Sequence, residues 1–206
     1  MAITINMAGR AALRLICASE SRSLACEPWL ADGHGSDDTG EAALTERPSA
    51  TIDVSGVTSP GPNDIYKGGW WTDGTDIDYV INGLNTAQTY RVVLHFCAPT
   101  GAVEGDYVVN AAIDGATSET PLSAQDLVTL AGAADAAYAT TTSMVPDANG
   151  EIAITVDTTS DEAVLCGIEV IAIPNAFTSH GISFSESPGS FTSHGISFSR
   201  SPGSFN

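Results

Sequence analysis

The chain has 206 residues, with 7 Lys and Arg residues against 25 Asp and Glu residues, so its formal net charge is -18 at pH 7. A chain this acidic repels a phosphate backbone or an anionic membrane surface, which excludes nucleic-acid and membrane binding as its functions. Hydrophobic residues make up 43 % of the sequence, enough to fill one core, and no run reaches the roughly 18 apolar residues of a membrane span.

Short segments of alternating apolar residues occur throughout the first 175 positions and predict half-buried β-strands. The alternation is clearest at residues 77–81, 90–96 and 152–156. Turn signals such as Asn-Gly and Asp-Gly separate many of the segments. The expected strands cover residues 3–6, 13–18, 51–54, 77–81, 90–96, 107–113, 139–144, 152–156 and 164–173.

Helical patterns are scarce in the sequence. Residues 131–137 are rich in alanine and could form a helical turn, but no segment shows a sustained apolar stripe with a period of 3.6 residues. The strand pattern therefore predicts an all-β fold, an antiparallel β-sandwich over residues 1–175.

The ends of the domain and the cysteines carry little functional signal. The opening residues read as a strand and lack the charged start and apolar centre of a signal peptide, so we expect none. Cys17, Cys26, Cys97 and Cys166 lack the spacing of a zinc site. A disulfide between Cys17 and Cys26 remains open, because spacing alone does not fix cysteine pairing.

Two consecutive strand segments resemble the paired central strands of the malectin family. Residues 90–98 read Tyr-Arg-Val-Val-Leu-His-Phe-Cys-Ala, close to the family's Y-x-V-x-L-H-F-A-E run. Residues 107–115 follow where the family has F-D-V-x-I-N-G. Residues 5–9, 29–32 and 166–170 also match family segments, in the same order. The resemblance covers about residues 3–173 and implies a malectin-like, jelly-roll type of sandwich.

The resemblance also implies a carbohydrate-binding module, in which exposed aromatic rings stack on sugar faces. Tyr66 and Trp71 lie where the family has two aromatic residues, and Trp70 stands beside them. Asp73 and Asp76 follow and could accept hydrogen bonds from sugar hydroxyls. These five residues are the predicted ligand-binding site. In the alternative interpretation, Trp70 and Trp71 close one end of the sandwich, with one ring inside and one outside.

One feature of the family's glucose-binding members is missing. They carry a second aromatic pair just after the H-F-A-E strand, and here that loop holds Pro99, Thr100 and Gly101. Half of the expected stacking surface is therefore absent. This favours a sandwich with a degenerate sugar site, that is, a purely structural subunit.

An acidic, glycine-rich loop is a candidate calcium site. Asp32, Asp37 and Asp38 could supply oxygen ligands to calcium, but their spacing fits no calcium loop, and a solvated acidic loop is the preferred interpretation. His34 and His95 are expected to be hydrogen-bonded structural residues. We expect no metal and no cofactor.

Catalysis lacks a recognisable arrangement of residues. Glu104, Asp106 and Glu169 are the acids nearest to the expected strands, and Glu169 falls on a strand position of the family pattern. No nucleophile elbow, zinc-protease motif or phosphate-binding loop is present. We therefore predict that the protein is not an enzyme.

The last thirty residues are of a different kind. Residues 177–190 and 191–204 are two copies of one 14-residue unit, identical at thirteen positions, with Glu186 in one copy and Arg200 in the other. Prolines and glycines exclude a coiled coil. The alternatives are a disordered serine-rich linker and an assembly anchor over residues 176–206. We prefer the anchor, whose predicted contact residues are Phe177, Phe184, Phe191, Phe198, Phe205, Glu186 and Arg200.

Together these features predict a non-enzymatic glycan-binding module, displayed on a larger assembly and fastened by its repeat tail. A surface polysaccharide and other protein subunits are the expected partners, in a homo-oligomer or particle. The expected location is the surface of a virion, a bacteriophage in particular, or of another extracellular particle. The alternatives are a structural decoration or filament subunit with a degenerate sugar site, and an accessory domain of a glycan-degrading system.

Overall fold

The computed structural model describes residues 3–17, 30–31, 42–44, 50–72, 76–159 and 162–174. The loop with Asp32, His34, Asp37 and Asp38, together with Cys26, Asp73 and the repeat tail, lies outside these ranges. The predictions for the tail and for a Cys17–Cys26 disulfide therefore stay predictions. The chain divides into two units at Asn175, and all described residues belong to the first.

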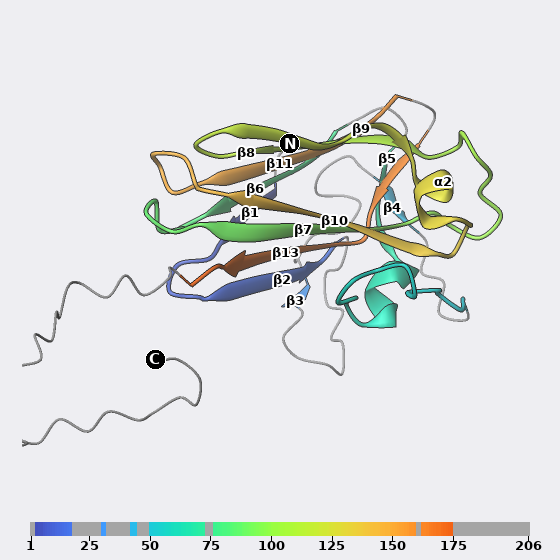
Figure 1. Cartoon of the computed structure of the whole chain (residues 1–206), viewed down its shortest axis with the longest axis horizontal. Helices are drawn as coiled ribbons and strands as arrows, with labels where there is room; N and C mark the ends of the chain where they lie inside the picture. The colour runs from blue at the N-terminus through green and yellow to red at the C-terminus, as the bar shows by residue number, and fades with distance from the viewer. Residues whose placement is uncertain are drawn as a thin grey trace, which may run out of the picture. The chain divides into compact units, whose positions relative to one another are not determined.

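Two five-stranded sheets form the two layers of a sandwich (Figure 1). Sheet A has the strand order β1-β6-β11-β8-β9 and sheet B the order β10-β7-β13-β2-β3. The strands of sheet A are β1 (Ile3–Asn6), β6 (Ile77–Asn82), β11 (Ile152–Thr158), β8 (Val108–Asp114) and β9 (Ser118–Asp126). Those of sheet B are β10 (Ala137–Met144), β7 (Tyr90–Cys97), β13 (Gly167–Ala172), β2 (Ala12–Ile16) and β3 (Leu30–Ala31).

A third, smaller sheet and two short helices complete the fold of the described residues. Sheet C has the strand order β12-β5-β4, and Figure 1 shows β4 and β5 running across one end of the larger sheets. Its strands are β12 (Ala163–Leu165), β5 (Gly69–Thr72) and β4 (Ala42–Leu44). The helices are the 3-10 helix η1 (Asn63–Lys67) and α2 (Leu127–Ala131).

The core lies between sheets A and B and is filled as the alternation predicts. Along β7, Val92, Leu94 and Phe96 are fully buried in the core cluster. Alternate residues of a strand point to opposite faces, and the same periodicity buries one face of each neighbouring strand. The predicted inward residues of sheet A are likewise buried: Ile77, Tyr79, Ile81, Ile152, Ile154 and Val156. The antiparallel sandwich is therefore confirmed, with parallel pairing only where β1 joins β6 and β3 joins β2 among the named strands.

The predicted strand at 51–54 is wrong. Only Asp53 makes a ladder contact, an isolated bridge to Ala136. The Asp53 carboxylate accepts a hydrogen bond from the Ser55 backbone N–H at 2.9 Å, which turns the chain away from an extended path. Ile52 is buried all the same, so the alternating pattern reports burial here and not pairing.

Other boundaries also differ from the sequence prediction. The helical turn lies at α2 rather than at 131–137, because the Asp126 carboxylate caps the Thr129 N–H at 2.6 Å and Gly132 ends the helix with φ 90°. Strand β9 was not predicted, since it is a polar edge strand with an irregular register. The predicted strand 164–173 is two strands, β12 and β13, in different sheets.

Gly150 and Gly101 form a matched pair for testing the turns. Both have a positive φ, of 76° and 88°. A Cβ at Gly150 would lie 2.6 Å from the Leu84 carbonyl oxygen, whereas nothing lies within 4 Å of one at Gly101.

We expect Gly101→Ala to lower the free energy of unfolding by about 1–2 kcal/mol, the cost of left-handed strain alone. Gly150→Ala adds a backbone clash and should cost about 3 kcal/mol. Urea unfolding of both variants measures the difference. Equal losses would mean that the turn at Gly150 relaxes to accommodate the methyl group.

Candidate binding pocket on sheet B

The outer face of sheet B, the face turned away from the core, carries a row of polar side chains. In the strand register Arg14 pairs with Glu169, Glu169 with Val93, and Val93 with Thr141. Arg91 lies two residues before Val93 on β7 and therefore on the same face. The row thus crosses four strands, and each of its side chains is positioned by the sheet.

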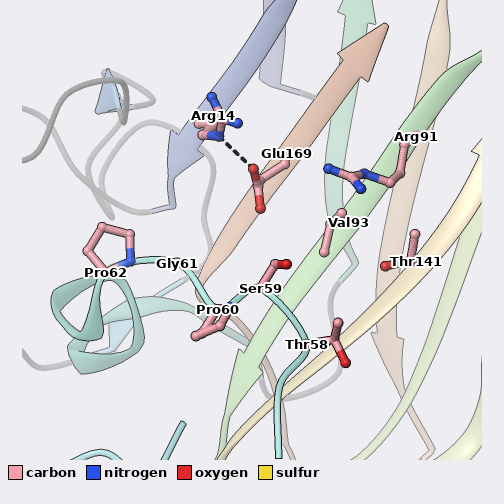
Figure 2. Close-up of a pocket in the computed structure, with 10 residues that line it drawn as sticks. All are labelled: Arg14, Thr58, Ser59, Pro60, Gly61, Pro62, Arg91, Val93, Thr141 and Glu169. Carbon is pink, nitrogen blue, oxygen red and sulfur yellow. Dashed lines mark hydrogen bonds and ion pairs between the residues drawn. The ribbon is translucent and has the colours of Figure 1, made fainter. Parts of the chain in front are cut away.

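Residues 58–62, which we call the cover segment, lie over this row and leave a pocket of about 340 Å³ between themselves and the sheet. Figure 2 shows the cover segment on one side and Arg14, Glu169, Val93, Arg91 and Thr141 on the other. The segment reads Thr-Ser-Pro-Gly-Pro, and its two prolines restrict the backbone.

A chain of buried and partly buried hydrogen bonds runs from the cover segment into the pocket wall. The Tyr66 hydroxyl contacts His95 Nδ1 at 2.8 Å, and His95 Nε2 contacts Glu169 Oε1 at 3.1 Å. Arg14 Nε donates to Glu169 Oε2 at 2.6 Å. The Gly61 backbone N–H, in the cover segment, also bonds the Tyr66 hydroxyl. We refer to Tyr66, His95, Glu169 and Arg14 as the relay.

The relay accounts for the burial of these polar groups. His95 is fully buried, and a neutral imidazole with its proton on Nε2 satisfies both contacts, donating to Glu169 and accepting from Tyr66. The expectation that His95 is a hydrogen-bonded structural residue is confirmed. Glu169 is also structural in this sense, since each of its oxygens has a partner.

The pKa of Glu169 reflects the balance of two effects. Burial, the largest single effect, raises the pKa of this carboxyl, but the hydrogen bonds from His95 and Arg14 and the positive charge of Arg14 together outweigh it and hold the pKa below its ordinary value. Burial also raises the pKa of Tyr66 well above its ordinary range, against the lowering effect of the Gly61 hydrogen bond. At neutral pH Glu169 is therefore ionised and Tyr66 keeps its proton.

Two of the predicted binding residues are not available to a ligand. Tyr66 and Trp70 have no exposed surface, and the Trp70 indole N–H donates to the Tyr79 hydroxyl at 2.7 Å. The prediction that these two rings stack on a sugar is wrong, because sheet C and η1 place both of them inside the domain. For Trp70 the alternative interpretation, a ring that fills the interior, is correct.

Of the remaining predicted residues, only Asp76 has a described side chain, and it does not line the pocket. The backbone of Trp71 pairs with Val164 and Ala42 in sheet C, while its side chain and all of Asp73 lie outside the described residues. Asp76 is exposed next to β6, in the opposite sheet. Its carboxyl is shielded enough from water to raise its pKa, and the charges of Asp78 and Asp157 raise the pKa further. Tyr66, Trp70 and Asp76 therefore do not form one site.

A second pocket, also of about 340 Å³, lies beside residues 99–101, the loop that lacks the second aromatic pair of the family. Its lining includes Thr100, Asp106 and Glu162. Asp106 accepts a hydrogen bond from the Val103 N–H at 2.9 Å, so this carboxylate helps to shape the loop. In the part of the chain that the structure describes, no three potential metal ligands gather at one place, and no helix is long and apolar enough to cross a membrane.

Sequence reasoning missed the two arginines of the sheet-B pocket. Arg91 and Arg14 are two of only seven cations in the chain, and each occupies an outward position of an alternating strand. That combination was a usable signal. The sequence of the cover segment gave no comparable signal. Its contact with sheet B depends on where the following helix, η1, packs in the folded domain.

Comparisons with known proteins identify the fold. No protein-family model and no curated protein matches the sequence. Among solved structures, the ANX2 ectodomain from Arabidopsis thaliana superposes with a TM-score of 0.59 and 18 % identity, over 79 % of this chain and 50 % of that one. The chain has a malectin-like fold. The expectation from the strand motifs is thus confirmed for the fold.

Two further structures agree with this assignment. The plant receptor-like kinase FER matches with a TM-score of 0.59 and 15 % identity, over 80 % of this chain and 50 % of that one. A structure of the plant peptide RALF23 in complex with FER and LLG2 matches with a TM-score of 0.59 and 14 % identity, over 78 % and 48 %. The malectin-like chain therefore spans about half the length of the chains it resembles.

The relay makes stability depend on pH. Because the folded pKa of Glu169 lies below the ordinary value of 4.5, its contribution is complete above that pH and is lost as the pH falls through the folded pKa. We expect Glu169→Gln to lower the free energy of unfolding by about 2 kcal/mol at pH 7, and by clearly less at pH 3. Denaturant unfolding at both pH values measures this.

Glu119→Gln removes the same charge from an exposed position on β9 and is the matched control. Its effect should be small at both pH values. If Glu169→Gln cost as much at pH 3 as at pH 7, the ion pair with Arg14 would not be the source of the loss.

Proposed function

We propose that this malectin-like domain is a non-enzymatic binding module that holds a glycan in the sheet-B pocket. The observation that carries the proposal is the pocket itself, where polar side chains from a rigid sheet face a proline-restricted segment. Hydroxyl and guanidinium groups suit a ligand rich in hydroxyls, since each sugar hydroxyl both donates and accepts.

Recognition in this pocket relies on hydrogen bonds rather than on stacking. Its lining residues include no aromatic side chain in the part of the chain described by the structure. Thr58, Ser59 and Thr141 provide hydroxyls, and Arg91 is exposed at the pocket. The glycan partner is thus the one expected from the sequence, at a different place on the sandwich.

The chemistry of Glu169 supports a role without catalysis. Both of its oxygens are held, and its lowered pKa keeps it ionised at neutral pH, so it cannot deliver a proton as a general acid. Glycoside hydrolysis needs two carboxyl groups about the scissile bond. Glu169 is the only acid that lines this pocket among the described residues.

We further propose that the domain acts outside the cell, as an exposed module. The support is that similar folds occur in ectodomains and extracellular domains, and that one matching structure holds a plant peptide in complex with FER. The proposal therefore includes protein or peptide partners in addition to a glycan. Display on a virion rests only on the sequence of the repeat tail.

One observation favours a second candidate function, a structural subunit with a degenerate sugar site. Two of the predicted binding rings, Tyr66 and Trp70, fill the interior instead of facing a ligand. In that case the sandwich is a scaffold and the repeat tail carries the assembly function.

Blocking the pocket tests the glycan proposal. Thr141 is exposed on the outer face of sheet B, and Thr141→Trp would fill the pocket without touching the core. We expect it to abolish binding to any glycan that the wild-type domain retains on a glycan array. Thr4→Trp, at an exposed position of sheet A, is the control and should bind as wild type. Equal binding by both variants would place the ligand elsewhere.

Removal of residues 176–206 tests the anchor. If the tail assembles subunits, the full chain should exceed the monomer mass in light scattering, and residues 1–175 should be monomeric with glycan binding unchanged. A monomeric full chain would rule out self-assembly through the tail and leave docking to a different protein.

A further inference from the structure

The sheet-B pocket is a small positive site in a chain whose net charge is -18. We propose that it is an oxyanion site, which binds a sulfate or phosphate ester group carried by the glycan. This inference rests on the proposed function, because it names the ligand chemistry of the same pocket. It is carried by the charges, the donor geometry and the backbone of the pocket.

The charges of the pocket leave one cation for a ligand. Glu169 neutralises Arg14 through the 2.6 Å ion pair. Arg91 is exposed and forms no ion pair with any residue that the structure describes, and Figure 2 shows its guanidinium group extending toward Glu169 and the pocket. With two arginines and one carboxylate in its lining, the pocket carries an excess of one positive charge.

The donors approach the pocket from several directions. Arg14 comes from β2, Arg91 from β7 and Thr141 from β10, while Ser59 comes from the cover segment. Figure 2 shows Ser59 and Thr141 on either side of Val93. A planar carboxylate is satisfied by one guanidinium in a bidentate pair. Donors spread over several sides fit the tetrahedral oxygens of a sulfate or phosphate ester better.

The backbone of the cover segment is strained where it faces the pocket. Ser59 has φ 56°, a conformation that is uncommon for any residue except glycine and is disfavoured further before Pro60. Backbone strain of this kind clusters at ligand clamps. The Gly61 bond to Tyr66 ties the segment to the relay and so helps to hold Ser59 over the sheet.

The acidity of the rest of the chain does not prevent such binding. Charges on the surface are screened beyond about 8 Å at physiological ionic strength, whereas Arg91 would contact the ester group directly. The acidic groups of sheet A, Asp76, Asp78 and Asp157, belong to the opposite layer. The pocket therefore selects an anion locally although the molecule repels anions at long range.

Two chemically matched ligands test the proposal. A sulfated oligosaccharide should bind at least tenfold more tightly than the same oligosaccharide after desulfation, by isothermal titration calorimetry. Arg91→Gln should remove this preference and Arg91→Lys should retain part of it. Arg10→Gln, which removes one exposed cation outside the pocket, is the control and should change affinity less than twofold. Thermal unfolding confirms that the variants fold.

Further ligands distinguish a sulfate from a phosphate ester, and they separate a failure of this inference from a failure of the proposed function. A phosphorylated sugar that binds like the sulfated one supports the oxyanion site, whereas equal binding of an oligosaccharide of uronic acids overturns the tetrahedral preference. Binding that is blocked by Thr141→Trp but unchanged by Arg91→Gln and by desulfation overturns this inference and leaves the proposed function standing.

Inorganic sulfate provides an arm that does not depend on the glycan. It should shift the NMR signals of residues around Arg91 in the wild-type domain and not in Arg91→Gln. If sulfate shifts these NMR signals but no oligosaccharide binds, the result would support the oxyanion site and contradict the proposal of a glycan ligand. The absence of shifts in the wild type would overturn the oxyanion site.

Discussion

The hydrogen-bond relay from Tyr66 to Arg14 is the interaction on which the pocket depends. A fully buried imidazole and a nearly buried carboxylate are tolerated only because each polar atom has a partner. The relay also joins two layers of structure, since Tyr66 lies in η1, beneath the cover segment, whereas His95, Glu169 and Arg14 lie in sheet B. Removing any member would leave a neighbour buried without its partner, which costs more than the bond itself contributes.

One strand, β7, shows how the sandwich produces both a core and a site. Val92, Leu94 and Phe96 pack between the sheets, while Arg91, Val93 and His95 point outward. The three core side chains fix the position of the strand. The three outward side chains are therefore held in fixed positions as well. A pocket built on such a face needs only its cover to be positioned separately, and the bond between Gly61 and Tyr66 contributes to this.

The fold was predictable from the sequence, and the site was not. Alternation at 77–81, 90–96 and 152–156 reports burial directly, and the order of the family motifs indicated a malectin-like sandwich. Exposure of an aromatic ring is not encoded in the same way: Tyr66 and Trp70 match or adjoin family positions, yet their surroundings bury them. The failure at 51–54 has the same origin, because Ile52 is buried without pairing. Burial patterns are local in sequence, whereas exposure depends on segments that fold back from elsewhere.

The overall negative charge of the domain and the local positive charge of the sheet-B pocket have separate roles. The first favours solubility and the second favours binding of an anion. Carboxylates can be spread over the surface of a malectin-like sandwich because repulsion between exposed charges is largely screened beyond about 8 Å at physiological ionic strength. Within a pocket a single uncompensated guanidinium is enough to reverse the local sign, provided that the nearest carboxylate already has partners. Glu169 meets this condition through Arg14 and His95. The relay therefore does more than stabilise the wall: by occupying Glu169, it leaves Arg91 as the charge that an incoming group meets.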